Sequence, residues 1–216
     1  DILGLLVDKV VEDPIAGKEL AMEYGLWDAV CERLELPIRL ALARVDVNTF
    51  IEYIIVDPAN SKKKNSDWTS MGVIGLGPDR NYVLLDLVRD RLNLGERANA
   101  LLDLHEKWLP LGVGYEEYGL QADIQHIEHI QGERNYRFKI TPLGGSMSKV
   151  DRIRRLIPLF EQGRVYLPKT IWRTLYDKTT VNLIDVFVEE EYAAFPVSVH
   201  DDMLDMLSRI EDEGMN

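Results

Sequence analysis

The sequence has a single cysteine, Cys31, so an intrachain disulfide is excluded. A chain without disulfides fits a reducing compartment. It has no apolar run long enough to cross a bilayer and no signal-peptide pattern, and we therefore expect neither a membrane-spanning helix nor a secretory leader. Because the chain begins with Asp1 rather than Met, we expect it to be a piece of a longer protein.

Basic residues are also few: 25 Lys and Arg face 37 Asp and Glu, which gives a net charge of −12. Nucleic-acid-binding domains are usually basic, so this balance argues against that class. Metal-dependent nucleases are an exception, because bound cations neutralise their carboxylates locally. With 46% hydrophobic residues, the 216 residues can bury a sizeable core, as one large domain or as one domain with an appendage.

The spacing of apolar residues divides the chain near residue 50. Residues 1–50 show helical spacing interrupted by Pro14 and Pro37, which predicts two helices in an N-terminal appendage or linker. Residues 51–216 form the second part. It has strands at 52–57, 69–77, 81–90, 112–117 and 136–141, an extended piece at 164–168, and helices at 94–110, 120–130, 148–163, 183–194 and 200–210. Three consecutive strands favour an antiparallel meander, joined at residues 77–80 by a turn, and the later alternation favours parallel crossovers. The fold class is therefore α/β, with a mixed sheet flanked by helices.

Acidic residues follow two of the predicted strands. Asp57 ends the first strand, and Glu116 and Glu117 end the strand that begins at Gly112. Ligand sites in sheets with parallel strands lie at the carboxyl ends of those strands. We therefore expect Asp57 and Glu116 to lie near the same site.

The last predicted helix carries three further acids. At 100° per residue, Asp201, Asp202 and Asp205 fall within an arc of about 100°, opposite an apolar face. Carboxylates gathered without cations would repel one another and raise their pKa values. Hard divalent ions such as Mg²⁺ or Mn²⁺ resolve this conflict, and two such ions can clamp a phosphodiester for in-line hydrolysis.

Each acid also has a simpler explanation. Asp57 precedes Pro58 and could be a turn residue. Asp201 and Asp202 could be first-turn acids favoured by the helix dipole, and Glu117 could be a solvated strand end. Their joint placement favours the metal site over these separate explanations.

Other polar patterns give weaker signals. Gly75 and Gly77 precede a strand rather than a helix, which argues against a dinucleotide loop. His126 and His129 share a helix face, but no third zinc ligand has matching spacing. Two basic groups could be solvated or could contact a DNA backbone near the acids: the run Lys62, Lys63 and Lys64, and a helix face with Lys149, Arg152 and Arg155.

Four segments together resemble a known family: "IIVDPANSKKKNSDWTSMGVIGL", "VGYEEYGLQADI", "TPLGGSMSKVDRIRRLIPLFEQGRVYLP" and "FPVSVHDDMLDMLSRI". In this order, over roughly residues 52 to 210, they are similar to the C-terminal nuclease domain of the large terminase subunit of tailed bacteriophages. That domain is a member of the RNase H-like superfamily. Residues 1–50 match no motif of the family, and no Walker A pattern marks an ATPase motor in this chain.

The resemblance implies roles for particular residues. Asp57, Glu116 and one or both of Asp201 and Asp202 correspond to the metal ligands, with Asp202 favoured. His200 and Asp205 complete the last motif, and Glu117 is a supporting residue. The family has a small residue after the final aspartate, where this chain has Met206, which we expect to change packing rather than chemistry. The resemblance also favours DNA contacts by Lys149, Arg152 and Arg155.

The resemblance implies that the protein is a two-metal endonuclease that uses Mg²⁺ or Mn²⁺. It would cut concatemeric viral DNA during packaging with little sequence specificity. Implied partners are double-stranded DNA, an ATPase motor in the full-length protein, a portal and a small terminase subunit. The implied setting is the host cytoplasm, away from membranes. Two other classes are weighed against it. An actin or sugar-kinase type ATPase would carry a duplicated domain with glycine-rich phosphate loops, and a non-catalytic RNase H-like docking module would not need acids at all three places.

Overall fold

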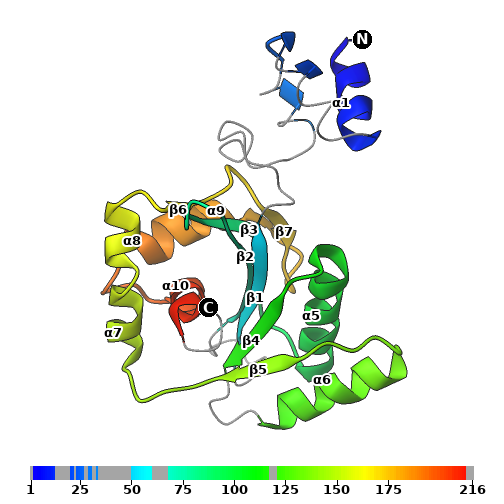
Figure 1. Cartoon of the computed structure of the whole chain (residues 1–216). Coiled ribbons are helices and arrows are strands. Elements are labelled where there is room, and N and C mark those ends of the chain that lie inside the picture. The colour runs from blue at the N-terminus through cyan, green and yellow to red at the C-terminus, as the bar shows by residue number, and fades with distance from the viewer. Residues whose placement is uncertain are drawn as a thin grey trace.

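The structure is a computed structural model that describes residues 2–12, 20–21, 23–26, 29–30, 33, 50–59, 68–116 and 121–212. Its centre is a six-stranded sheet with the order β5-β4-β1-β2-β3-β6 (Figure 1). The strands are β1 (Ile51–Asp57), β2 (Thr69–Leu76), β3 (Tyr82–Asp90), β4 (Gly112–Glu116), β5 (Ile140–Leu143) and β6 (Val165–Tyr166). β1, β2 and β3 form an antiparallel meander, whereas β4 is parallel to β1, β5 to β4, and β6 to β3. The predicted mixed sheet is confirmed.

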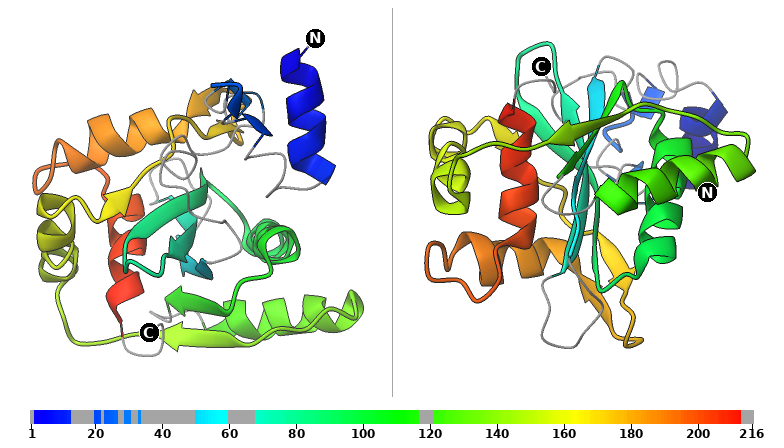
Figure 2. Two further views of the ribbon diagram at one scale, coloured as in Figure 1. Left: turned by 45° about the horizontal axis from the view of Figure 1, so that its top comes forward. Right: turned by 90° about the horizontal axis from the view of Figure 1, so that it is seen from below.

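Helices cover both faces of this sheet, which is seen between them in the right-hand view of Figure 2. One face carries α5 (Leu94–Trp108) and α6 (Gln121–Glu133). The other carries α7 (Lys149–Arg154), α8 (Ile157–Glu161), α9 (Leu183–Val186), the π-helical turn η2 (Phe187–Tyr192), α10 (Asp202–Ser208) and the 3₁₀ turn η3 (Arg209–Glu211). The N-terminal helix α1 (Ile2–Glu12) contributes to a separate small apolar cluster with Ala21 and Val30. None of the helices described here has the length and apolar character needed to cross a membrane.

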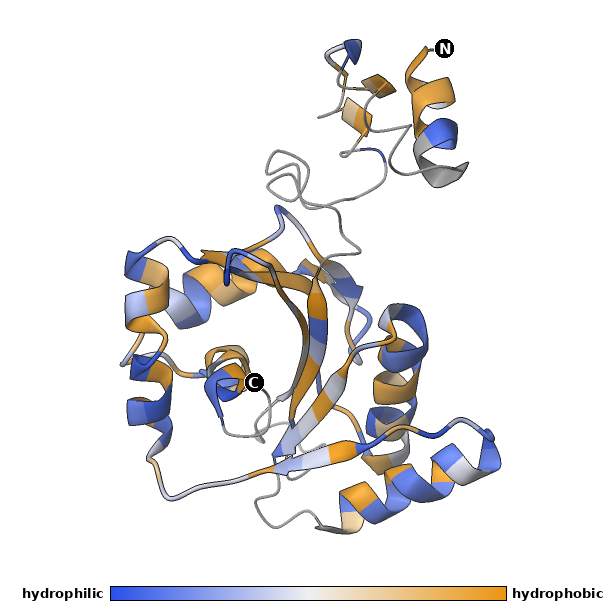
Figure 3. Ribbon diagram, viewed as in Figure 1, coloured by the Kyte–Doolittle hydropathy of each residue, from blue (hydrophilic) through white to orange (hydrophobic). Residues whose placement is uncertain are grey.

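The central strand β1 is buried on both sides, and this explains its unbroken apolar sequence. Tyr53 and Ile55 pack in the cluster that includes α7, α8, α9 and α10, whereas Ile54 and Val56 pack in the cluster under α5 and α6. The hydropathy colouring of Figure 3 shows this apolar strand in the middle of the sheet. By the same alternation, the side chain of Asp57 belongs to the α10 face.

Three elements differ from the sequence prediction. The strand predicted at 136–141 lies at Ile140–Leu143 instead, as β5, and overlaps the prediction at residues 140–141. The helix predicted over residues 148–163 is divided into α7 and α8, because Pro158 has no N–H to donate to the carbonyl of Arg154. Gly163, with φ +65°, ends this region as expected. A small hairpin of β7 (Trp172–Thr174) and β8 (Thr180–Asn182) was not predicted, since each strand has only three residues.

The close approach of α10 to the sheet depends on Gly72 in β2. A Cβ atom at this position would lie 2.6 Å from Cε and 2.7 Å from Sδ of Met206. The missing side chain of Gly72 therefore makes the space that the Met206 side chain fills. Met206 is 1% exposed, so the expectation that it changes packing agrees with its position.

Candidate functional site

Asp57 and Glu116 lie side by side because they end neighbouring parallel strands. Val56 of β1 pairs with Tyr115 of β4, and each acid is the next residue of its strand. Val113 and Tyr115 pack toward α5 and α6, so the alternating Glu116 faces α10, as Asp57 does. The sequence prediction that strand ends bring these two carboxylates together agrees with this arrangement.

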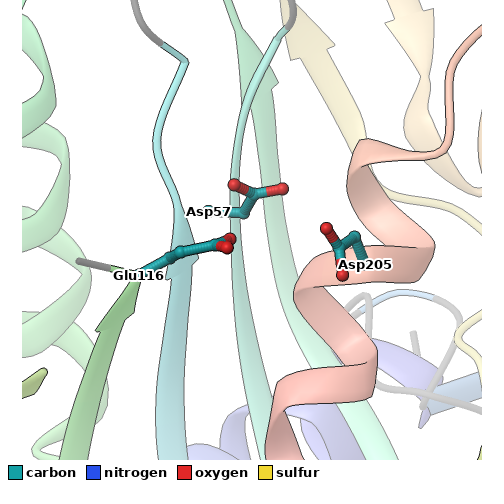
Figure 4. A group of neighbouring side chains, drawn as sticks. All are labelled: Asp57, Glu116 and Asp205. Atoms are coloured by element: carbon teal, nitrogen blue, oxygen red, sulfur yellow. The ribbon is translucent and has the colours of Figure 1, made fainter. Parts of the chain in front are cut away.

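The third carboxylate comes from α10. One oxygen each from Asp57, Glu116 and Asp205 lies within 4.8 Å of the others, and Figure 4 shows the three side chains pointing toward one another. In the part of the chain that the structure describes, no other group of three or more His, Cys, Asp or Glu side chains comes this close. We call these three residues the acidic cluster.

Asp201 and Asp202, favoured from the sequence as the third ligand, lie beside the cluster rather than within it. Asp202 begins α10 and is 3% exposed, and its Oδ2 accepts a hydrogen bond of 3.4 Å from the Trp68 amide. Asp201 precedes the helix, and its Oδ1 lies 2.7 Å from Nζ of Lys149. Asp205, placed in a supporting role by the sequence, is one turn further along, where α10 meets β1 and β2.

Three cations hold the carboxylates in place. Arg152 donates from Nε and Nη2 to the two oxygens of Asp205, both at 2.7 Å, and its Nη2 lies 3.8 Å from Oε1 of Glu116. Arg209, 1% exposed, donates from Nη2 to Glu116. Lys149 lies 3.5 Å from Oδ2 of Asp205. Each cation compensates part of the charge that burial would otherwise leave unpaired.

The predicted basic face of Lys149, Arg152 and Arg155 therefore contacts α10 and η3, with Arg152 buried and Lys149 and Arg155 partly exposed. Arg155 donates from Nη2 to the carbonyl oxygen of Ser208 at 3.1 Å and to Oδ1 of Asp212 at 2.5 Å. The three-residue spacing of these basic residues correctly predicted that they share one helix face. It could not predict that acids near the C-terminus, more than 45 residues away, would pack against this face.

The carboxylates of the cluster influence one another's pKa values. Burial, followed by the charges of Glu116 and Asp205, raises the pKa of Asp57 well above its usual range. Burial also raises the pKa of Asp205, although Lys149 and Arg152 oppose the shift. Three convergent carboxylates with this mutual repulsion form an all-oxygen donor set that fits a hard divalent ion.

The remaining predicted residues have varied positions. Nδ1 of His200 lies 3.9 Å from Oδ2 of Asp202. Glu117, Lys62, Lys63 and Lys64 lie outside the described residues. His129, on α6 at the other face of the sheet, lies 3.6 Å from its neighbour Glu133, and neither His126 nor His129 belongs to a ligand cluster among the residues described.

The sequence analysis missed two residues that position the site, Arg209 and Glu191. Glu191, fully buried in η2, accepts hydrogen bonds from the amides of Met203 at 2.9 Å and Leu204 at 3.0 Å. It therefore caps the first turn of α10 from a distant segment. Arg209 is a charged residue within the apolar pattern "MLSRI", which was the available signal, whereas Glu191 is one of three consecutive glutamates in "VEEEYAA" and no local pattern distinguishes it.

Glu191 should make stability depend on pH. Burial raises its pKa from 4.5 to about 7, although the Leu204 amide and Arg89 oppose this. A raised folded-state pKa gives a contribution that is present below pH 4.5 and lost as the pH rises through about 7. We expect Glu191→Gln to flatten the pH dependence of urea unfolding between pH 5 and 8 by about 2–3 kcal/mol. The exposed Glu189→Gln is the control, and equal pH profiles for wild type and Glu191→Gln would contradict the prediction.

Comparison with known proteins identifies the family. The sequence profile described as "Terminase RNaseH-like domain" matches residues 54–209. The chain belongs to the terminase RNase H-like family. The match begins within β1 and ends at Arg209, so it includes every residue of the acidic cluster. No curated protein sequence matches this terminase domain significantly.

Solved structures agree on the fold of this terminase RNase H-like domain. The human cytomegalovirus terminase nuclease domain superposes with a TM-score of 0.56 at 15% identity, covering 80% of this chain and 88% of that one. A manganese-soaked, inhibitor-bound structure of the same viral domain gives 0.55 at 12% identity with the same coverage. The large terminase nuclease from the thermophilic phage G20c has a TM-score of 0.47 at 19% identity, covering 74% of this chain and 81% of that one. At these identities the likeness to the cytomegalovirus domain shows the RNase H-like fold.

Proposed function

We propose that this domain is a metal-dependent endodeoxyribonuclease that cuts concatemeric viral DNA during genome packaging. The observation that supports the proposal most directly is the meeting of Asp57, Glu116 and Asp205 at the carboxyl ends of β1 and β4. Three convergent carboxylates cost stability where positive charge does not balance them, and divalent ions would add to the charge that Lys149, Arg152 and Arg209 supply. In a domain of the terminase RNase H-like family, such ions would also serve phosphodiester cleavage. The similar fold of the human cytomegalovirus terminase nuclease domain supports the same reaction class.

We propose that Asp57, Glu116 and Asp205 hold the first of two divalent ions, with Asp202 and Asp201 as further ligands. Mg²⁺ or Mn²⁺ would supply Lewis acidity toward the phosphodiester and activation of the attacking water. Arg152 and Arg209 fix the carboxylates of Asp205 and Glu116 in one orientation, so little reorganisation is needed when substrate arrives. The manganese-soaked cytomegalovirus domain makes Mn²⁺ the first ion to test.

The DNA contacts proposed here are to phosphates, which gives binding with little sequence preference. Lys62, Lys63 and Lys64 follow Asp57 closely in the sequence and supply local positive charge in a chain whose net charge is −12. Lys149 borders the acidic cluster and is 37% exposed. Arg152 and Arg155 are occupied by internal carboxylates, so we assign the first DNA contacts to the lysines.

The test is nicking of supercoiled plasmid by the purified chain with Mn²⁺, with Mg²⁺ and with EDTA. We expect nicked and linear products with the metal ions and none with EDTA. Binding of DNA without cleavage would support the docking-module alternative. Release of phosphate from ATP, without nicking, would support the actin-type ATPase instead.

Asp205→Asn and Asp202→Asn should separate the roles of the two α10 acids. Asp205 lies within the cluster, so its amide should reduce cleavage at least about a thousandfold, equivalent to several kcal/mol of lost stabilisation. Asp202 lies at the margin, and its amide should reduce cleavage by about 10–100-fold. Cleavage rates and Mn²⁺ affinity by titration calorimetry measure both effects. A larger loss in Asp202→Asn would reverse the assignment.

We also propose the larger setting in which this nuclease works. The ATPase motor, portal and small terminase subunit are proposed partners, and the host cytoplasm is the proposed location. The division into an appendage at 1–50 and a nuclease domain at 51–216 stays a prediction. Limited proteolysis followed by mass spectrometry checks it through cleavage near residue 50.

A further inference from the structure

Lys149 is surrounded by acids from α10 and its N-terminal boundary. Its Nζ lies 2.7 Å from Oδ1 of Asp201, 3.5 Å from Oδ2 of Asp205 and 3.8 Å from Oδ1 of Asp202. One ammonium group therefore stands among three carboxylates, two of which are 4% exposed at the side chain. A small cation with several oxygen neighbours is the arrangement that a divalent ion would also adopt.

Lys149 differs from the two arginines that contact the same acids. Arg152 is 6% exposed and Arg209 is 1% exposed, and each makes hydrogen bonds to a second partner besides a cluster carboxylate. Lys149 is 37% exposed at the side chain, and its ammonium is a point charge on a flexible stem. Of these three cations, Lys149 has the most exposed side chain and therefore loses the least buried contact when it moves away from its carboxylates.

Electrostatic repulsion by a bound divalent ion favours movement of the Lys149 ammonium away from the α10 carboxylates. The described part of this region has six acids (Asp57, Glu116, Asp201, Asp202, Asp205 and Asp212) and four cations (Lys149, Arg152, Arg155 and Arg209). A divalent ion placed among the α10 acids would lie within a few ångströms of the ammonium, and the two like charges would repel each other. The freed side chain is long enough to keep its charge near the site, where a phosphate would be its natural partner.

We infer that Lys149 is a displaceable internal cation: it neutralises Asp201, Asp202 and Asp205 in the ion-free protein, is released when a divalent ion binds, and then contacts a DNA phosphate. This inference rests on the proposed function for its DNA substrate, but the competition with metal does not require cleavage. Two consequences follow. Lys149 weakens ion binding in the free protein, and ion binding strengthens DNA binding through Lys149.

The first arm of the test measures ion binding without DNA. Titration calorimetry with Mn²⁺ should show about tenfold tighter binding to Lys149→Gln than to wild type, because the competing charge is absent. Lys149→Arg keeps the charge and should not gain affinity. Lys107→Gln is the matched control, since Lys107 pairs with Asp86 at 2.8 Å on the other side of the sheet. Equal Mn²⁺ affinity for wild type and Lys149→Gln would overturn the inference.

The second arm measures DNA binding with Ca²⁺, chosen to limit cleavage, and with EDTA. For each protein, the slope of log affinity against log salt counts phosphate contacts, at about 0.9 per contact. In Ca²⁺ the slope should be about 0.9 smaller in magnitude for Lys149→Gln than for wild type, whereas in EDTA the two should agree. A slope difference that is the same in both conditions would overturn ion-coupled release.

The outcomes also separate this inference from the proposed function. Wild type that binds Mn²⁺ and DNA with the expected slopes but does not nick plasmid would contradict the nuclease proposal and leave the Lys149 inference standing. Nicking by wild type with no change in Mn²⁺ affinity on Lys149→Gln would contradict only the inference. Circular dichroism of each variant establishes that it is folded, and Lys149→Arg provides the charge-preserving variant if Lys149→Gln does not fold.

Discussion

Asp57→Asn should abolish plasmid nicking while leaving a folded protein that melts at a higher temperature than wild type. The loss of activity follows because one carboxylate of a three-member cluster is removed, and cleavage should fall at least about a thousandfold. The gain in stability follows from the raised pKa of Asp57, caused first by burial and then by Glu116 and Asp205. Ionised Asp57 therefore opposes folding, and a neutral amide does not.

The stabilising effect of Asp57→Asn should depend on pH, so the melting temperatures should be compared at low and at high pH. Because the folded-state pKa is raised, the contribution of Asp57 is present at low pH and lost as the pH rises toward that pKa. The melting temperature of Asp57→Asn should exceed that of wild type by at least about 3 °C at pH 8 and approach it at pH 4. Mn²⁺ should raise the melting temperature of wild type more than that of the variant. Asp103→Asn, an exposed acid on α5, is the control. Wild-type cleavage by folded Asp57→Asn would reject the proposed site.

Arg209→Met should produce the largest loss of stability among single substitutions near the site. The guanidinium of Arg209 is 1% exposed and connects Glu116 with Asp212, so methionine removes the hydrogen-bond donor of a buried carboxylate and leaves it facing Arg152 at 3.8 Å. Breaking such a buried pair costs about 3–5 kcal/mol. In a domain of this size that lowers the melting temperature by roughly 10 °C.

The matched comparison is Arg155→Met, which also removes an arginine paired with Asp212. The Arg155 side chain is 29% exposed and does not contact the acidic cluster, so the loss should be about 1 kcal/mol or less. Mn²⁺ should recover part of the stability of Arg209→Met, because it can compensate Glu116, but none of that lost in Arg155→Met. Differential scanning calorimetry with and without Mn²⁺ measures both effects. Equal destabilisation by the two substitutions would show that Arg209 does not support the cluster.

The positions of Asp57 and Glu116 could be derived from the sequence because each depends on local pattern alone. A strand of apolar residues ends at each acid, and parallel pairing places the two ends together. The meander and its Gly77–Arg80 turn were predictable for the same reason, and the turn is closed by a 2.9 Å hydrogen bond from the Arg80 amide to the Gly77 carbonyl.

The choice among the α10 acids could not be derived in this way. A helical wheel gives the angle between Asp202 and Asp205, but the rotation of the helix against the sheet depends on packing at Met206 and Gly72. The arginines that pair with the acidic cluster could not be predicted either, because they are distant from it in the sequence. Arg152 and Asp205 are 53 residues apart, and Arg209 and Glu116 are 93 apart, so no local period connects them.

The contact between Gly72 and Met206 has a consequence for how this family can diverge. A methyl group at position 72 would lie within 3 Å of Cε and Sδ of Met206, so the end of the Met206 side chain has to turn away if α10 is to stay where it is. A residue shorter than methionine at position 206 removes this contact and leaves room on β2 for a side chain at position 72. The two positions can therefore exchange volume, and Gly72→Ala should be tolerated better together with Met206→Ala than alone.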